Sequence, residues 1–100
     1  MPVKKKAVKR TPNINFMKAF VEDFIEGRSS RLDFDLDFSY HVINRYDKMY
    51  RENRDFAEAF AFYVSEQGFD IGERLPEDEY IQLISEQYQI LLDAERDGFF

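Results

Sequence analysis

The sequence predicts an all-α protein, a compact bundle of about four helices with a basic segment at its N-terminus. Four stretches of the 100-residue chain carry apolar residues at helical spacing. The connections between them are short, and no two convincing strands occur that could pair with each other. Eleven Phe and six Tyr supply large side chains for the core of a single domain, which we place at residues 13–100.

Residues 1–12 are predicted to be a disordered basic tail. They lack apolar periodicity and contain no acidic side chain. Their charge is +5, against −11 for the rest of a chain whose total is −6. The sequence therefore joins a basic segment to an acidic body, and such a body favours basic protein partners over nucleic acid phosphates. The basic residues are Lys4, Lys5, Lys6, Lys9 and Arg10.

The first helix is expected at residues 14–26. Gly27 suits the position just after a helix, and Thr11, Asn13 and Asn15 compete as its N-cap. The apolar residues that share one stripe of this helix are Met17, Phe20, Val21, Phe24 and Ile25.

The next stretch, RLDFDLDFSY at 31–40, alternates apolar and polar residues as a strand does. Aspartate is a poor strand residue, however, and three carboxylates on one face would repel each other. We therefore expect an extended or turn-like lead from Arg31 to about Asp37, in which Phe34 and Leu36 pack against the body. A helix over 38–51 would follow, capped by Asp37 or Ser39.

A third helix is predicted at 55–67. Asp55 and Glu58 have the spacing of a capping box, although the sequence also permits one continuous helix with 38–51. Phe60 is expected at the centre of the hydrophobic body, and Gly68 is expected to end the helix with Phe69 making the contact that follows such a stop.

The fourth helix is predicted at 77–97, between Pro76 and Gly98. Acidic residues in its first turn suit the positive end of the helix dipole. Its apolar residues again have helical spacing: Tyr80, Ile81, Ile84, Tyr88, Leu91 and Leu92.

No metal, cofactor or catalytic site is predicted. The chain has no cysteine, which excludes thiolate chemistry and disulfides. Asp33, Asp35 and Asp37 have the first offsets of a calcium-binding loop, but Phe38 stands where that loop needs glycine and Asn44 where it needs glutamate. His41 is the single histidine, and we expect it at the surface or as a cap. No nucleophile and base are arranged as an enzyme would need.

The leading functional hypothesis is a small non-enzymatic protein-binding module, an adaptor, inhibitor or regulator that is able to self-associate. Its acidic surface would meet a basic protein partner, and aromatic side chains left outside the core would be the anchors. The alternative is a nucleic-acid-associated accessory protein that contacts phosphates through the five basic tail residues. We expect a cytoplasmic protein without membrane contact, because no apolar run approaches the roughly 18 residues of a membrane span. The predicted protein-contacting residues are Phe62, Phe69, Phe99 and Phe100.

Overall fold

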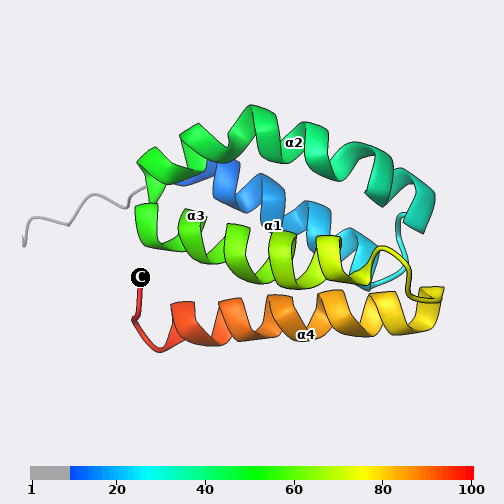
Figure 1. The fold of residues 1–100 in the computed structure, drawn as a ribbon. Helices are drawn as coiled ribbons and strands as arrows, with labels where there is room; N and C mark the ends of the chain where they lie inside the picture. The colour runs from blue at the N-terminus through cyan, green and yellow to red at the C-terminus, as the bar shows by residue number, and fades with distance from the viewer. Residues whose placement is uncertain (1–9) are drawn as a thin grey trace, which may run out of the picture.

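Residues 10–100, which the computed structural model describes, fold into four helices (Figure 1). They are α1 (Pro12–Ile25), α2 (Arg31–Glu52), a third helix made of α3 (Arg54–Phe60) and η1 (Ala61–Asp70), and α4 (Glu77–Arg96). The backbone stays helical from α3 into η1, where it widens to a π-helix. This architecture confirms the predicted all-α bundle of four helices.

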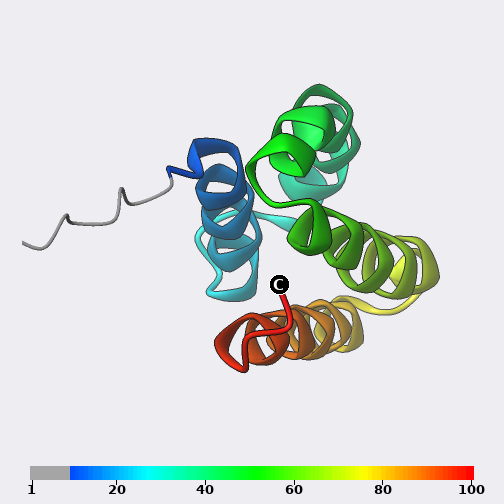
Figure 2. The same cartoon turned by 90° about the vertical axis from the view of Figure 1, so that its left-hand side faces the viewer.

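Successive helices run in opposite directions and are arranged around a common centre (Figures 1 and 2). α1 packs against α2 and α4, and the third helix packs against α2 through α3 and against α4 through both of its parts. α2 and α4 are therefore diagonal neighbours. One side of α2 faces the bundle, and the opposite side is covered by no other helix of residues 10–100.

The core is built around stacked aromatic rings contributed by three helices. Phe34 of α2 lies 4.2 Å from Phe24 of α1 and 5.3 Å from Phe38, measured between ring centroids. Phe38 in turn stacks on Phe69 of η1 at 4.6 Å. Phe60 is 1% exposed, so its predicted place in the hydrophobic body is confirmed.

α1 begins at Pro12, two residues before the predicted start, and it is capped from another helix. Thr11 occupies the N-cap position, but its side chain makes no capping hydrogen bond. The carboxylate of Glu52, at the end of α2, accepts from the backbone N–H groups of Asn13 and Ile14 at 2.9 Å each. The prediction that Gly27 follows the helix is confirmed, because Gly27 has a φ of +82°.

The expected extended lead at 31–37 is wrong, because α2 is helical from Arg31 onward. Ser30 is its N-cap and accepts from the backbone N–H of Asp33 at 3.1 Å, so neither Asp37 nor Ser39 caps the helix. In a helix, residues four apart share a face, which brings Phe34 and Phe38 together on the inner side. Phe34 is buried as expected, whereas Leu36 points to solvent and is 67% exposed.

The helices at 38–51 and 55–67 are separate, and Asn53 is the residue that divides them. Its backbone is extended, with φ −160° and ψ 103°. Its side-chain oxygen accepts from the N–H of Phe56 at 3.1 Å, so Asn53 has the capping role that we expected of Asp55.

The predicted stop at Gly68 is wrong, because the helix continues through Asp70. Gly68 is buried, and a Cβ atom there would lie 3.0 Å from Cδ1 of Ile84 on α4. The glycine therefore permits close packing of η1 on α4 and does not end the helix. α4 itself agrees with the prediction to within one residue, and Gly98 beyond it has a φ of +85°.

Candidate protein-interaction surface

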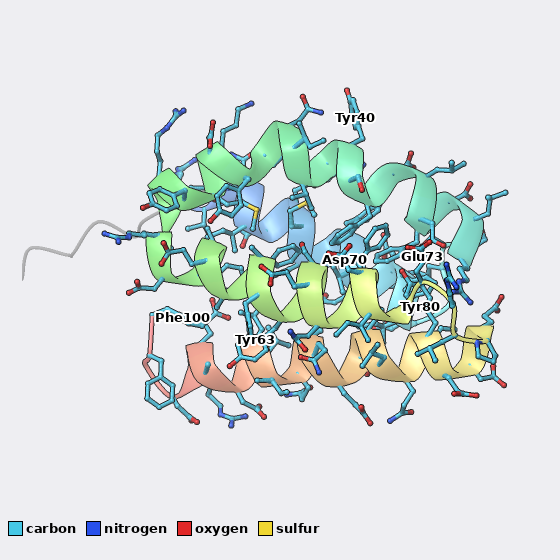
Figure 3. All side chains as sticks on the ribbon, viewed as in Figure 1. Tyr40, Tyr63, Asp70, Glu73, Tyr80 and Phe100 are labelled. Atoms are coloured by element: carbon cyan, nitrogen blue, oxygen red, sulfur yellow. The ribbon has the colours of Figure 1, made fainter. Side chains whose placement is uncertain are left out.

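The outer side of α2 carries a row of exposed apolar side chains, which we call the outer stripe. It consists of Leu32, Leu36, Tyr40 and Ile43, whose exposed fractions are 67%, 67%, 64% and 79%. At about 100° per residue these four positions fall within about 80° of arc on the helix. Figure 3 shows Tyr40 pointing away from the bundle. Tyr50, 37% exposed, lies on the same line near the end of the helix.

The charged residues beside the outer stripe change sign along α2. Near its N-terminal end stand Asp33 and Asp37, and near its C-terminal end stand Lys48 and Arg51; all four are exposed. They lie on the same side of the stripe, about 100–160° around the helix from Leu32. One flank of the stripe is thus acidic at one end and basic at the other.

A second feature is a hollow of about 180 Å³ where α2 and η1 face each other, which we call the α2–η1 groove. α2 packs closely on α3 but less closely on η1, and this divergence leaves the hollow open. Ile43 belongs to both the outer stripe and the groove, so the two surfaces are continuous. The groove is lined by Phe38, Ser39, Val42, Ile43, Ser65, Phe69 and Asp70.

Acidic side chains border the α2–η1 groove at the end nearest the turn between η1 and α4. A neighbouring hollow of about 120 Å³ shares Phe69 and adds Asp35, Glu73 and Tyr80 to the lining. Figure 3 shows Asp70, Glu73 and Tyr80 at this same end of the molecule. Within residues 10–100, the carboxylates of Asp70 and Glu73 form no ion pair. The two hollows together have an aromatic floor and an acidic border.

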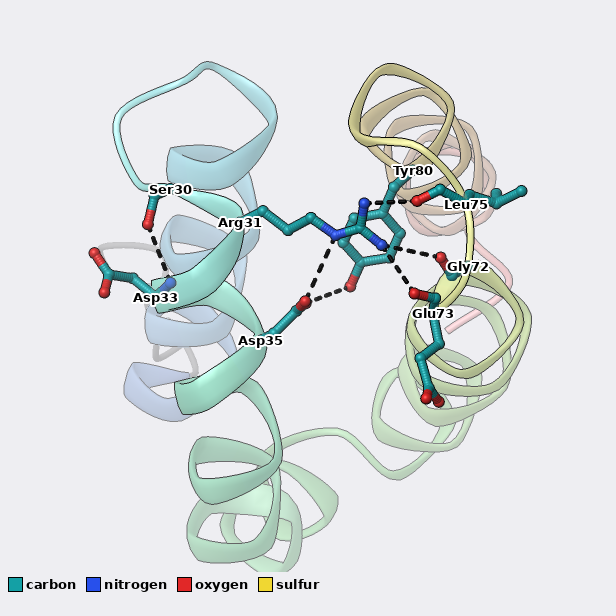
Figure 4. A network of polar contacts seen from close by, with 8 residues as sticks. All are labelled: Ser30, Arg31, Asp33, Asp35, Gly72, Glu73, Leu75 and Tyr80. Atoms are coloured by element: carbon teal, nitrogen blue, oxygen red, sulfur yellow. Dashed lines mark hydrogen bonds and ion pairs between the residues drawn. The ribbon is translucent and has the colours of Figure 1, made fainter.

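A polar network holds this end of the groove in place (Figure 4). The guanidinium of Arg31 donates to the carbonyl oxygens of Leu75 at 2.6 Å and Glu73 at 3.0 Å, and it lies 4.1 Å from the centre of the Tyr80 ring. The Tyr80 hydroxyl donates to Asp35 at 2.9 Å. Burial, together with this hydrogen bond, raises the pKa of Tyr80 well above its ordinary value of about 10. The network connects the start of α2 to the turn between η1 and α4.

A third hollow, about 380 Å³, lies along the outside of α4 and is shallow and open. It involves Leu75, Asp78, Glu79, Gln82, Leu83 and Glu86. Because one helix and one flanking residue form its whole lining, it offers a partner a surface contact but no enclosed site for a side chain.

The structure does not bring the four predicted protein-contacting aromatics into one patch. Phe69 is half-buried and lines the groove, near the start of α4. Phe100 is at the opposite end, where its ring packs 5.7 Å from that of Phe56 (Figure 3). Phe99 is exposed beyond α4, and Phe62 is exposed on η1 against Tyr63. Sequence reasoning missed the outer stripe, because we expected its N-terminal half to be an extended lead.

The predicted phosphate-contacting residues fall mostly outside the described part of the chain. Lys4, Lys5, Lys6 and Lys9 lie there, and Arg10 is exposed two residues before α1. His41 is half-buried, with its ring 4.9 Å from those of both Phe16 and Phe20. It therefore contributes to packing between α1 and α2.

Residues 10–100 contain no cluster of three or more His, Asp or Glu side chains suited to a metal ion. In the same part of the chain, none of the helices has the length and apolarity that crossing a bilayer requires.

No family model, curated protein or solved structure shows significant similarity to this chain.

Proposed function

We propose that the protein is a small non-enzymatic protein-binding module whose α2–η1 groove accepts a basic segment of another protein. The observation that carries this proposal is the combination of an aromatic floor, formed by Phe38 and Phe69, with border carboxylates that form no ion pair within residues 10–100, those of Asp70 and Glu73. The segment would insert one large apolar side chain and place Lys or Arg next to those carboxylates.

Each part of the groove has a different effect on such a partner. The apolar floor supplies affinity, since an anchor side chain that fills a hollow is removed from water there. The exposed carboxylates supply orientation and faster association, which salt weakens. The Ser65 hydroxyl is buried in the groove wall without a hydrogen-bond partner in residues 10–100, and it offers a polar contact to the incoming segment.

Nuclear magnetic resonance titration with a designed peptide tests the proposal. The probe is an amphipathic peptide with one central Leu as the anchor and Lys on both flanks. Its control has the same composition in a scrambled order. We expect the amphipathic peptide to shift the amide signals of Val42, Ser65, Phe69 and Asp70, and to bind more weakly as salt is raised. Shifts confined to α4, or equal binding of the scrambled peptide, would contradict the proposal.

Paired charge removals sharpen this test. Asp70→Asn combined with Glu73→Gln is expected to weaken peptide binding several-fold, because each exposed ion pair contributes about 0.2–1 kcal/mol. The matched control, Asp78→Asn with Glu79→Gln, removes the same charge from the shallow hollow on α4 and should leave binding unchanged. A larger loss in the α4 variant would move the binding site to that helix.

The alternative function, phosphate contact through Lys4, Lys5, Lys6, Lys9 and Arg10, is supported by the +5 charge of this segment. Residues 11–100 keep all of α1 and lack the basic cluster, so they provide the comparison with the full chain. If all five charges contact duplex DNA, the logarithm of affinity falls with the logarithm of salt at a slope of about −4.5. Absence of binding by the full chain at low salt would exclude this function.

A further inference from the structure

We infer that the outer stripe of α2 is a self-association surface, on which the α2 helix of a second copy packs antiparallel about a two-fold axis. This inference does not depend on a partner in the α2–η1 groove. It rests on three features of α2: the length of the apolar stripe, the sign change along its flank, and the absence of any covering helix from residues 10–100.

The stripe has the form of a helix-packing surface. From Leu32 to Tyr50 it extends about 27 Å along the axis, at about 1.5 Å per residue. Its four most exposed side chains, at positions 32, 36, 40 and 43, have the three- and four-residue spacing by which one helix packs along another. Scattered single apolar residues are ordinary on a protein surface, whereas an aligned row of this length indicates a partner surface.

The charges on the flank select the occupant and its direction. A two-fold axis perpendicular to both helices brings the same flank of the two copies to the same side, with their directions reversed. With the axis near residues 41–42, Tyr40 faces Ile43 of the second copy. Asp33 and Asp37 then lie beside Lys48 and Arg51 of the second copy, and the symmetry repeats this pairing at the other end. In a parallel pair the two-fold axis would run along the helices and put this flank of the two copies on opposite sides, so its acidic and basic ends would not meet.

One residue opposes the association and limits its strength. Asp47 is exposed and lies within the arc of the stripe, between Ile43 and Tyr50. In the antiparallel pair it falls near Leu36 of the second copy, where it interrupts the apolar contact. We therefore expect a reversible dimer with a contact area at the small end of the range for specific interfaces. The same residue provides a gain-of-function variant, since Asp47→Leu removes the interruption.

Sedimentation equilibrium of the full chain over a wide concentration range tests the surface. We expect the wild type to populate a dimer as concentration rises, Leu36→Glu to weaken the dimer at least tenfold, and Asp47→Leu to tighten it. Phe99→Glu is the matched control: it also places an acid at an exposed apolar position, away from α2, and should dimerise like the wild type. A wild type that is monomeric at millimolar concentration overturns the inference, as does a control variant that dissociates as readily as Leu36→Glu.

Charge exchange tests the antiparallel direction. Asp37→Lys and Lys48→Glu should each weaken the dimer, because each puts like charges together across the two-fold axis. The double variant restores opposite charges in an antiparallel pair and should regain most of the lost affinity. A double variant that stays as weak as the single ones overturns the proposed direction. Because Leu36 and Lys48 do not line the groove, Leu36→Glu should still bind the Lys-flanked peptide, so the two proposals can fail separately.

Discussion

The two sides of α2 carry similar side chains in very different surroundings. On the inner side, Phe34 and Phe38 are 0% and 2% exposed and contact rings from α1 and η1. On the outer side, Leu36 and Tyr40 are about two-thirds exposed, although they alternate with those phenylalanines in the sequence. Composition alone does not separate the two sets. The helical period separates them, because it assigns positions 34 and 38 to one face and positions 36 and 40 to another.

This comparison shows what the apolar residues of α2 contribute. The inner side is needed for folding, since its rings have fixed neighbours within the chain. The outer side has no such neighbours within residues 10–100, and in our inference it is the surface on which a second copy packs. The predictions below separate stability from association, starting with the largest expected effect.

Removing an inner ring should cost the most stability. Phe34 contacts Phe20, Phe24, Phe38 and Tyr80, so Phe34→Ala leaves a cavity among rings from three helices. Burial and cavity effects together give an expected loss of about 3–5 kcal/mol. Chemical denaturation followed by circular dichroism measures it. A loss below about 1 kcal/mol would mean that the ring is not in the core.

Most of the fold could be predicted from the sequence. In α1 and α4 the spacing of the apolar residues fits a helix and does not fit a strand. Gly27 and Gly98, both at positive φ, also follow those helices as expected. The start of α2 was wrongly predicted to be extended because its apolar and polar residues alternate over ten positions, as they do in a strand. The same alternation is also compatible with a helix that has apolar residues on two opposite faces. The sequence did contain a correcting signal in Ser30 and Asp33, which have capping-box spacing. The prediction that Gly68 ends a helix was wrong because the glycine serves tertiary packing instead. A Cβ atom at position 68 would crowd Ile84, which lies sixteen residues away in the sequence and on another helix.

The candidate surfaces could be predicted only in part. Phe69 was expected at a contact surface, and it does line the groove. The groove itself depends on how far α2 diverges from η1, a tertiary property that no local pattern contains. The outer stripe became visible only once α2 was known to begin at Arg31, because Leu32 and Leu36 then join Tyr40 and Ile43 on one face.

The network at the start of α2 should give the next largest effect. Arg31→Met keeps an unbranched apolar side chain over Tyr80 but leaves the carbonyl oxygens of Glu73 and Leu75 without their donor. We expect a loss of roughly 1–3 kcal/mol, as for other polar groups deprived of a partner. Hydrogen exchange should also speed up selectively in the η1–α4 turn. Arg54→Met, which removes an exposed arginine at the start of α3, is the control and should change neither quantity.

Alkaline pH should reveal the two buried tyrosines. Burial and hydrogen bonds to Asp35 and Glu22 raise the pKa values of Tyr80 and Tyr88 above their unfolded value of about 10. The neutral phenols therefore contribute stability that is fully present below pH 10 and is lost as the pH rises beyond it. Melting temperature should fall above about pH 10. A variant with Tyr80→Phe and Tyr88→Phe should show a shallower fall, and an unchanged profile would assign the alkaline loss to other groups.

The smallest expected effect on stability is at Leu36, and it completes the comparison with Phe34. Leu36→Ala removes a side chain that is 67% exposed, so the change in unfolding free energy of the monomer should stay within about 0.5 kcal/mol. The measurement must be made at a concentration low enough to keep the chain monomeric, because dimer formation adds apparent stability by mass action. At high concentration the wild type should therefore melt at a higher temperature than Leu36→Ala, while at low concentration the two should coincide. Ile90→Ala, at an exposed position on α4, is the control and should show no such dependence on concentration. A loss of several kcal/mol from Leu36→Ala in the monomer would mean that the outer side of α2 is packed within the chain.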